Sequence, residues 1–459
     1  MRSWNDASQT GPTSRITTKA GPASTHMAPF PQIITPPGNV EEAQDLFDKI
    51  RLLLDNAQGA PHIPSATSRH SSGSLLVGSA KHFEDRVQEA AATERGQRLL
   101  SDAALIVPTS GTTSDRPSLV VLSTRALAFA AQQTHDALRG PGRWVIALPL
   151  SHIAGIQMLV RCAVAKTRPV FPASWPTFDP RLFARAIQNV AHAHPDGSVN
   201  PRPLYASVVS AQLEAILRSE SWVVDAVSRL DAVLVGGGRI DQALLEEARQ
   251  RGIMAHTTYG MTETCGGCVY DGKPLPGTAI FIAPEGSTRD QPGQILLRTP
   301  ALMSGYLDEN DPFENVSGAR YFRTSDLGYV LSDRLHVTGR GDDVIKSGGV
   351  KINLSAVAKS IESNPEVSQV HCLGLDDPTW GQTVAAVVVP TVVLEGQHAL
   401  ADLAASIRET VKRDLGAPQM PRTVVVTDTL PRTSISKVHT ARVKEILEEA
   451  IRFGIAWQR

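Results

Sequence analysis

Apolar residues follow two spacings along this chain, and the two spacings predict different elements. From Val40 to Asn56 they recur every three or four residues, which is typical of an amphipathic helix. Lys81 to Arg95 has the same spacing and predicts a second helix. Ala103–Val107 and Leu119–Leu122 are instead short, unbroken apolar runs, which favour buried strands.

From residue 123 onward, strand-like and helix-like segments alternate. A helix should begin at Ser123 or Thr124, because either hydroxyl can cap it. The segments that follow are predicted as strands at Trp144–Leu148, Pro169–Phe171, Leu204–Val209, Ala232–Val235 and His256–Tyr259, and as helices at Ile153–Ala165, Pro180–Ala191, Ala211–Arg218 and Gln242–Arg251. This alternation indicates an α/β fold with several parallel sheets wrapped by helices.

The pattern changes after Gly277 to short strands with polar turns, among them Gly293–Leu297 and Leu335–Thr338. These predict a small β-rich subdomain that completes a large N-terminal domain over residues 40–339. Residues 340–459 predict a small α+β C-terminal lid, with helices at Leu354–Ser363, Leu400–Leu415 and Thr440–Ile451 and strands at Val367–Leu375, Thr383–Val389 and Thr423–Thr427. Residues 1–39 are rich in Ser, Thr, Pro and Gly without periodicity, so we expect them to be disordered.

Composition and charge restrict the class of function. The 45 basic and 46 acidic residues give a net charge of −1, which provides no overall field for nucleic acid or an anionic membrane. No apolar run is long enough to span a membrane, and no signal-peptide core is apparent. Cys265 and Cys268 form a CxxC without a second pair, so we interpret the four cysteines as reduced thiols of a cytoplasmic protein. The sequence does not decide whether the chain forms a homo-oligomer.

The stretch Gly339–Gly349 lies between the two predicted domains. It contains four glycines, an Arg and two adjacent Asp, so it can turn sharply or act as a pivot. A tight linker with solvated charges is an equally good interpretation of this stretch taken alone.

Two further loops follow predicted strands. Thr109, Ser110, Gly111, Thr112 and Thr113 offer backbone N–H groups and hydroxyls that suit phosphate oxygens, although a polar turn would use the same residues. Gly236, Gly237 and Gly238 would let a flat ring lie against the backbone, or simply make a close strand-to-helix turn.

Thr258–Thr264 is the stretch that indicates a ligand site most clearly, because an aromatic ring, a Gly, a hydroxyl and a carboxylate stand at the carboxyl end of a predicted strand. Ligands bind at that edge of open parallel sheets. Tyr259 could stack on a base, and Glu263 could hold a Mg²⁺ that bridges phosphates. A capped helix N-terminus is the alternative, but it leaves the Tyr-Gly unexplained. Asp326 could accept hydrogen bonds from ribose, and Lys437 is either a catalytic cation or an ordinary surface Lys.

Taken together and in order, these motifs resemble the adenylate-forming superfamily of acyl- and aryl-CoA ligases, carrier-loading adenylation domains and luciferases. The shared order runs from the Thr-Ser-Gly-Thr-Thr loop through Leu148–His152, the triple Gly, Tyr-Gly-Met-Thr-Glu, Thr-Ser-Asp and Gly-Arg-Gly-Asp-Asp to Lys437. The resemblance covers about residues 100 to 440.

The resemblance implies ATP, Mg²⁺ and coenzyme A as ligands and a role for each motif. Thr109 to Thr113 would close over the phosphates. Gly236 to Gly238 and Tyr259 would frame the adenine, and Asp326 and Arg340 would hold the ribose. The implied catalytic groups are Thr262 at the α-phosphate, Glu263 on Mg²⁺, and Lys437, which the lid would deliver by turning about Asp342. Gly348 and Gly349 would line the path of the thiol.

Two departures from the family pattern stand out. Ser114–Ser118 of the phosphate loop lacks the usual Gly and Lys and is one residue longer, and Ser436 replaces the usual Gly before Lys437. These departures leave room for a weaker grip on phosphate.

Within the superfamily, Thr134–Trp144 and Ala147–Arg161 look most like the o-succinylbenzoate–CoA ligases of menaquinone biosynthesis. Their substrate is a dicarboxylate, and a charge midway along an apolar helix is expensive unless it is paired. The resemblance therefore implies that Arg161 binds the second carboxylate, with His152 and Gly260 at the acyl pocket. A surface Arg or an internal salt bridge, and a structural His, are the alternatives. Another aryl- or acyl-CoA ligase, a carrier-loading domain and a degenerate nucleotide-binding protein also remain open.

Overall fold

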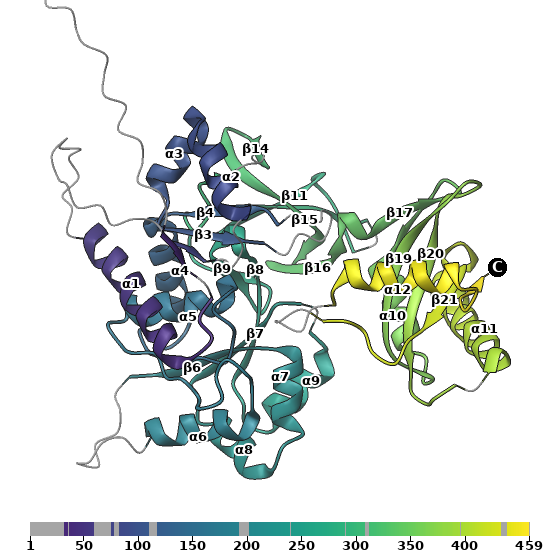
Figure 1. Cartoon of the computed structure of the whole chain (residues 1–459), viewed down its shortest axis with the longest axis horizontal. Coiled ribbons are helices and arrows are strands. Elements are labelled where there is room, and N and C mark those ends of the chain that lie inside the picture. Colours follow the sequence, from purple (N-terminus) through teal and green to yellow (C-terminus); the bar gives the residue numbers. More distant parts are fainter. Residues whose placement is uncertain are drawn as a thin grey trace, which may run out of the picture.

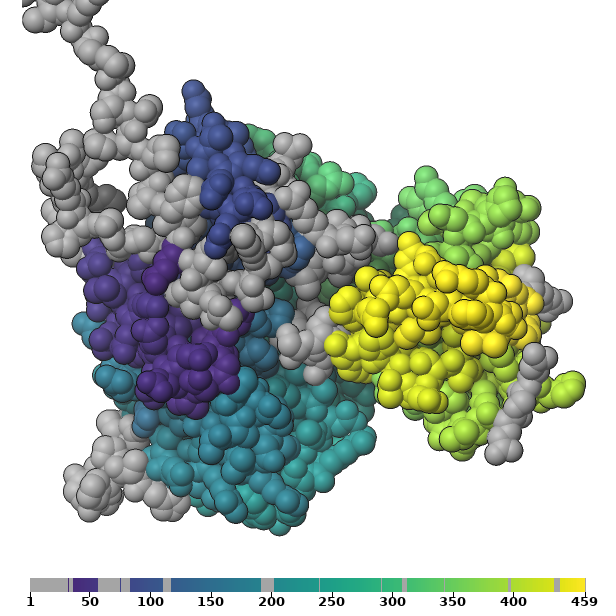
Figure 2. Space-filling view, in the orientation of Figure 1, coloured from purple at the N-terminus to yellow at the C-terminus, as the bar shows by residue number. Residues whose placement is uncertain are grey.

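The computed structural model describes residues 32–34, 36–58, 75–77, 82–109, 117–191, 202–238, 240–289, 291–307, 312–394, 396–432 and 438–458. Figure 1 shows the helices and strands up to β16 gathered in one large body and the elements from β17 onward in a smaller unit beside it. The space-filling view in Figure 2 shows the same two parts, with the C-terminal residues in yellow on the smaller one.

The first sheet of the large body has the order β1-β2-β3-β4-β13. Its strands are β1 (Gln32–Ile34), β2 (Leu75–Val77), β3 (Leu105–Pro108), β4 (Leu119–Leu122) and β13 (Gly305–Tyr306). The helices that accompany it are α1 (Val40–Gln58), α2 (His82–Ala91), α3 (Glu94–Asp102) and α4 (Thr124–Ala137). β1 lies inside the segment expected to be disordered, so part of that segment is ordered; residues 1–31 and 35 lie outside the described residues.

The second sheet has the order β10-β9-β8-β7-β6-β5. The strands β5 (Arg143–Val145), β6 (Leu204–Val209), β7 (Ala232–Gly236) and β8 (Ala255–Met261) are parallel, whereas β9 (Gly266–Tyr270) and β10 (Lys273–Pro274) are antiparallel. The helices between them are α5 (Ile153–Val164), α6 (Pro180–Ala191), α7 (Ser210–Leu217), α8 (Ser221–Val227) and α9 (Gln242–Gln250). This is the predicted parallel sheet, extended by an antiparallel edge.

The third sheet is antiparallel and is the predicted β-rich subdomain. It contains β11 (Ala279–Ala283), β12 (Gly293–Arg298), β14 (Phe313–Val316), β15 (Ala319–Leu331) and β16 (Arg334–Arg340). The single 3₁₀ turn η2 (Gly341–Asp343) follows β16 directly, where the large body ends.

The fourth sheet and three helices form the C-terminal unit, as predicted. Its strands are β17 (Val344–Ser347), β18 (Val350–Asn353), β19 (Val367–Asp377), β20 (Gly381–Pro390), β21 (Thr423–Val426) and β22 (Trp457–Gln458), and its helices are α10 (Leu354–Glu362), α11 (Gly396–Leu415) and α12 (Thr440–Arg452). Two apolar clusters of its own, one on each side of β20, stabilise this unit.

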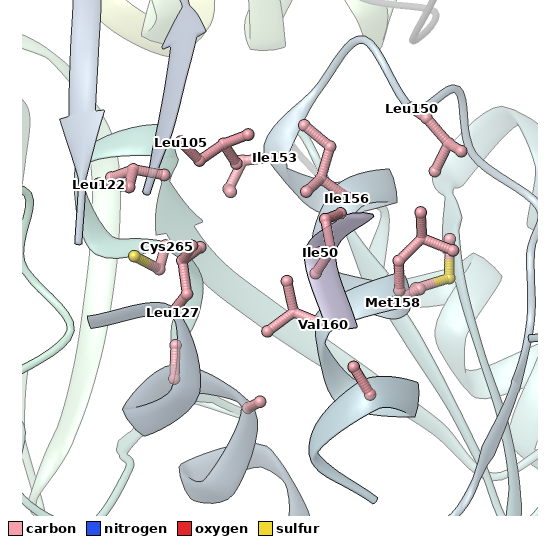
Figure 3. Close-up of a cluster of buried hydrophobic side chains, with 14 of the residues drawn as sticks. Ile50, Leu105, Leu122, Leu127, Leu150, Ile153, Ile156, Met158, Val160 and Cys265 are labelled. Atoms are coloured by element: carbon pink, nitrogen blue, oxygen red, sulfur yellow. The ribbon is translucent and has the colours of Figure 1, made fainter. Parts of the chain in front are cut away.

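α5 lies at the centre of the largest apolar cluster. Figure 3 shows Ile153, Ile156 and Val160 of this helix among side chains from α1, β3, β4 and α4. Burying one such side chain contributes roughly 1.5–3 kcal/mol. Gly155 lets the helix approach the preceding loop, because a Cβ there would lie 2.1 Å from the carbonyl oxygen of Pro149.

The predicted elements agree with the observed ones in type almost throughout, with three corrections. The helix predicted over Lys81–Arg95 is two helices, because the Thr93 side chain accepts a hydrogen bond from the Gly96 N–H and starts α3. Pro169–Phe171 makes an isolated bridge at Val170 rather than a strand, and α8 was not predicted. The predicted cap of α4 is confirmed at Ser123, which accepts from the Ala126 N–H at 3.2 Å.

None of the helices that the structure describes is both long and apolar enough to cross a membrane.

Candidate active site

The candidate site lies at the carboxyl ends of β7 and β8, where the parallel part of the second sheet meets the third sheet. Gly236 ends β7, and a Cβ there would lie 2.3 Å from Thr258 Oγ1, so a larger residue would require the Thr258 side chain to move. Gly237 has a φ of +85°, which favours glycine in the turn that follows. A Cβ on Gly238, by contrast, would meet nothing within 4 Å. Packing and backbone geometry thus favour glycine at two of the three positions but not at Gly238.

Tyr259 connects the second sheet to the third. Its hydroxyl donates a 2.8 Å hydrogen bond to Asp326 Oδ2, although the two residues are 67 positions apart. The Asp326 N–H donates in turn to Thr324 Oγ1, and Asp326 pairs with Arg340 across β15 and β16. Burial, followed by the nearby Asp326 charge, raises the pKa of Tyr259. The structure therefore brings together Tyr259, Asp326 and Arg340, three residues for which the sequence predicts contacts with a nucleoside.

Gly260 is also explained by the backbone. A Cβ at this position would lie 2.0 Å from the carbonyl oxygen of Gly266, because the antiparallel ladder of β8 and β9 has a bulge between Tyr259 and Gly260. The chain returns from β8 to β9 through Cys265, which adopts a left-handed conformation with a φ of +52°. A glycine after Tyr259 is thus required for the close approach of two strands.

Glu263 lies in the single 3₁₀ turn η1 (Thr262–Thr264) rather than at the start of a longer helix. The interpretation of Thr262 and Glu263 as a capped helix N-terminus is therefore wrong. The Tyr306 hydroxyl donates a 2.8 Å hydrogen bond to Glu263 Oε1. Burial raises the pKa of Glu263, while this hydrogen bond and the Arg340 charge lower it.

The surroundings of Glu263 fit a Mg²⁺ ion. A nearby divalent cation would stabilise a carboxylate whose burial disfavours ionisation. In the described part of the chain no three His, Cys, Asp or Glu side chains are grouped as metal ligands. Mg²⁺ suits such a site, because it usually takes one or two carboxylates and completes its octahedron with water and substrate phosphates.

Arg161 is buried in α5, with only 4% of its surface exposed. Its guanidinium carbon lies 4.6 Å from the centre of the Trp144 ring, and its Nη2 donates to the Tyr270 hydroxyl at 3.4 Å. Tyr270 is also hydrogen-bonded to Thr134, at 2.8 Å. Among the described residues no carboxylate forms an ion pair with Arg161, so neither the surface Arg nor the internal salt bridge describes it.

Two further polar side chains are buried near Arg161. His135 is 1% exposed, and neither of its ring nitrogens has a hydrogen-bond partner in the described structure. Burial, and then the Arg161 charge, lower the pKa of His135 to about 4, so its ring is neutral at pH 7. Gln157, one helical turn before Arg161, is fully buried beside Gly266, and its Oε1 is similarly without a partner. His135 and Gln157 were not singled out from the sequence, because only the fold places them next to Arg161.

His152 is the N-cap residue of α5, and its carbonyl oxygen accepts hydrogen bonds from the N–H groups of Gly155 and Ile156. Its side chain does not cap the helix. Its predicted place at the border of an acyl pocket stays a prediction.

At the junction with the C-terminal unit, Asp342 occupies η2, but its side chain lies outside the described residues. Gly348 and Gly349, with φ values of +56° and +84°, form the two-residue turn between β17 and β18. The ring of Trp380 packs directly on Gly348, and the Arg422 guanidinium lies 4.4 Å from the centre of that ring. The turn itself explains both glycines, and their proposed contact with a thiol stays a prediction.

Some predicted residues lie outside the described part of the structure. They are Ser110 to Thr113 of the phosphate loop, together with the altered stretch up to Arg116, and Lys437. The base of the loop is described: the Thr109 N–H donates to the Ser118 carbonyl oxygen at 2.9 Å, as β3 passes into β4.

Family comparison agrees with this geometry. Residues 48–307 match the AMP-binding enzyme family, and residues 357–437 match the AMP-binding enzyme C-terminal domain. The chain belongs to the AMP-binding enzyme family, which confirms the predicted superfamily and its two-domain α/β fold.

Comparison with individual relatives shows which members of the family this chain resembles. The chain is 35% identical to a probable 2-succinylbenzoate–CoA ligase of Mycobacterium tuberculosis (strain CDC 1551 / Oshkosh), over 75% of this chain and 85% of the relative. It is 30% identical to an indoleacetate–CoA ligase of Aromatoleum aromaticum, over 75% of this chain and 67% of the relative. A solved structure of o-succinylbenzoate CoA synthetase from Bacillus subtilis, in complex with an acyl-adenylate intermediate, has the same fold, with a TM-score of 0.65, 22% identity and coverage of 90% of this chain and 95% of that one.

Proposed function

We propose that this chain is an ATP-dependent ligase that adenylates o-succinylbenzoate and transfers the acyl group to coenzyme A. The products are o-succinylbenzoyl-CoA, AMP and pyrophosphate. The similarity to 2-succinylbenzoate–CoA ligases supports the choice of acid, and the residues around β8 support the chemistry. We place the enzyme in the cytoplasm, since its four cysteines are buried and not disulfide-bonded.

The first half-reaction requires a carboxylate oxygen to attack the α-phosphorus of ATP while pyrophosphate leaves. Tyr259, Asp326 and Arg340 would fix the nucleoside, so that the phosphorus stays in line with the acid. Glu263 would hold the Mg²⁺ that neutralises phosphate charge when it is bound. Thr262 would contact the α-phosphate, and the Lys437 ammonium would stabilise the negative charge that builds on it.

In the second half-reaction the thiol of coenzyme A attacks the acyl carbonyl, and AMP leaves with the electrons of the anhydride bond. This step needs different groups around the same carbonyl. We propose that the C-terminal unit turns about Asp342 to exchange Lys437 for the Gly348–Gly349 turn.

The observation that carries the choice of acid is the buried guanidinium of Arg161. A cation that contacts Trp144 and Tyr270 and has no carboxylate partner among the described residues is costly in a pocket for a monoacid. A diacid would supply the missing anion, because its succinyl carboxylate is activated while its ring carboxylate reaches Arg161. His135 and Gln157 would then lie beside that carboxylate.

The test measures pyrophosphate release from the purified protein with ATP, Mg²⁺, coenzyme A and one acid at a time. We expect turnover with o-succinylbenzoate and about 10- to 100-fold lower kcat/KM with benzoate, because a charge-assisted pair is worth roughly 1.5–3 kcal/mol. Turnover with indoleacetate, benzoate or a fatty acid but not with o-succinylbenzoate would reject the assignment.

The same assay separates other functions. Acid-dependent pyrophosphate exchange without turnover of free coenzyme A would indicate a carrier-loading domain. Failure of every acid to support exchange would indicate a nucleotide-binding protein without catalysis.

A further inference from the structure

The hydrogen bond from Tyr306 to Glu263 joins two segments that the sequence does not connect. Tyr306 belongs to β13, the edge strand of the first sheet, whereas Glu263 follows β8 of the second sheet. The bond is 2.8 Å long and ends on Oε1 of a buried carboxylate. One carboxylate oxygen is thereby oriented from outside its own sheet.

The backbone around Tyr306 makes this contact rigid. The Met303 N–H donates to the Glu263 carbonyl oxygen at 2.8 Å, so the same segment holds both the backbone and the side chain of Glu263. Ser304 and Leu307 donate N–H bonds of 2.9 and 2.8 Å to the carbonyls of Val121 and Leu119 in β4. Leu119 directly follows the loop whose base is closed by Thr109 and Ser118.

The side chain of Arg95 also holds the segment that contains Tyr306. Arg95 of α3 donates from Nη2 to the carbonyl oxygen of Tyr306 at 2.8 Å and from Nη1 to that of Leu307 at 3.4 Å. The tyrosine backbone is therefore fixed both by β4 and by a helix of the first sheet. Because its backbone is fixed, the Tyr306 hydroxyl has a defined position, from which it can orient the Glu263 carboxylate.

From this geometry we propose that Tyr306 is a positioning residue for the metal: its hydroxyl fixes one oxygen of the Glu263 carboxylate and so sets the orientation in which the carboxylate binds Mg²⁺. The inference rests on the proposed function, in which Glu263 holds Mg²⁺. Outer partners of this kind fix the orientation of a ligand, and their loss typically weakens metal affinity about 10- to 100-fold.

The test compares nucleotide binding with and without the metal, by titration calorimetry on the full chain. Tyr306→Phe keeps the ring and removes only the hydroxyl. We expect it to bind ATP about 10-fold more weakly than wild type in excess Mg²⁺ and to leave AMP binding in EDTA unchanged, while the thermal unfolding midpoint falls slightly because one partly buried hydrogen bond is lost. Tyr329→Phe is the matched control, because Tyr329 lies in β15 with its ring stacked on His336, and it should behave as wild type.

Glu263→Gln distinguishes a failure of this inference from a failure of the proposed function. It should lose the effect of Mg²⁺ on ATP binding, and adding Tyr306→Phe to it should weaken binding no further. If ATP binding by Glu263→Gln responds to Mg²⁺ like that of wild type, the proposed role of Glu263 as a Mg²⁺ ligand is wrong, and so is the role of Tyr306 that depends on it. If Glu263→Gln behaves as expected but Tyr306→Phe binds ATP like wild type, or loses AMP binding in EDTA to the same degree, only the role of Tyr306 is overturned.

Discussion

Several buried polar atoms of Arg161, His135 and Gln157 have no hydrogen-bond partner among the described residues, namely Arg161 Nε, both ring nitrogens of His135 and Gln157 Oε1. Arg161, His135 and Gln157 come from two adjacent helices and are each at most 4% exposed. An unsatisfied buried polar group costs about 1–3 kcal/mol, so a cluster of them calls for an explanation. A bound carboxylate would supply acceptors for Arg161 and for a donor nitrogen of His135.

Arg161→Met tests this explanation with a side chain that can still pack on Trp144. We expect KM for o-succinylbenzoate to rise at least about 10-fold, because a hydrogen-bonded charge pair is lost, while KM for ATP changes less than about 2-fold. Steady-state kinetics with each substrate varied in turn provides the measurement. An unchanged KM for the diacid would return Arg161 to a structural role.

His135 predicts a pH dependence of stability. Its pKa falls from 6.5 to about 4 on folding, through burial and then Arg161, with Asp136 opposing. Between these values the unfolded chain binds a proton that the folded chain does not, so stability decreases as the pH falls from 6.5 towards 4. The loss reaches about 3 kcal/mol for this one group.

Urea unfolding at several pH values checks this prediction. His135→Gln should flatten the slope between pH 6.5 and 4, whereas His398→Gln, which alters an exposed residue of α11, should retain it. Equal slopes in wild type and His135→Gln would contradict the pKa of the buried ring.

Sequence reasoning found those site residues that carry the chemistry in their type and spacing. Tyr259, Glu263 and Asp326 were singled out because an aromatic ring and two carboxylates stood at predicted strand ends, and the role of Arg340 was implied by the family resemblance. Tyr306, Tyr270 and His135 were not, because a hydroxyl or an imidazole has no distinguishing pattern until a fold supplies its partner. The functional roles of the first group remain predictions, although their convergence is now observed.

At the scale of elements, the bulge in the antiparallel ladder of β8 and β9 shapes the site. The strands approach so closely that Gly260 has no room for a methyl group beside the Gly266 carbonyl. The glycine was noticed in the sequence for its place after Tyr259, but the reason for it is the antiparallel neighbour. Pairing between strands is not encoded by either strand alone.

Gly260→Ala should therefore destabilise the protein by about 1–3 kcal/mol, as is usual for overpacking. Gly238→Ala should leave stability nearly unchanged, since a Cβ there meets no atom within 4 Å. Differential scanning calorimetry of both variants gives the comparison. A similar loss of stability in the two variants would show that the close contact between β8 and β9 at the bulge is not the cause.

Gly238→Ala also tests the predicted adenine site, because its effect on binding is separated from packing. If the ring lies against this backbone, AMP affinity should fall by about 10-fold, corresponding to 1.4 kcal/mol. Calorimetric titration with AMP measures the change, with Gly38→Ala as the comparison, because Gly38 is exposed and a Cβ there would meet its nearest atom only at 3.8 Å. Unchanged AMP affinity would place the adenine elsewhere.

The elements themselves were largely predictable, because most follow a clear apolar period. The exceptions have local causes. Thr93 interrupts one period by capping a new helix, and Pro169 lacks the N–H that a ladder needs. α8 has only seven residues, too few for a period to show.

At the scale of the whole molecule, we propose that the C-terminal unit takes one position relative to the large body for adenylation and another for thioester formation. Lys437→Ala should abolish adenylation, measured as acid-dependent pyrophosphate exchange, by a factor of about 100 or more, because it removes a charge that acts in the transition state. It should spare thioester formation from supplied acyl-AMP. Lys444→Ala, which alters an exposed Lys of α12, is the control and should leave both steps intact. Equal loss of adenylation and thioester formation in Lys437→Ala would contradict the proposed turn of the C-terminal unit between the two steps.

The ladder between β15 and β16 has a consequence for what happens between the steps. Asp326 and Arg340 face each other as the last pair of that ladder, and the chain leaves it only at Gly341. Any rotation that starts at η2 therefore leaves the pairing of these two residues, and the ribose contacts we propose for them, unchanged. A reactive anhydride would be retained while the catalytic groups change over, which protects it from escape and from water.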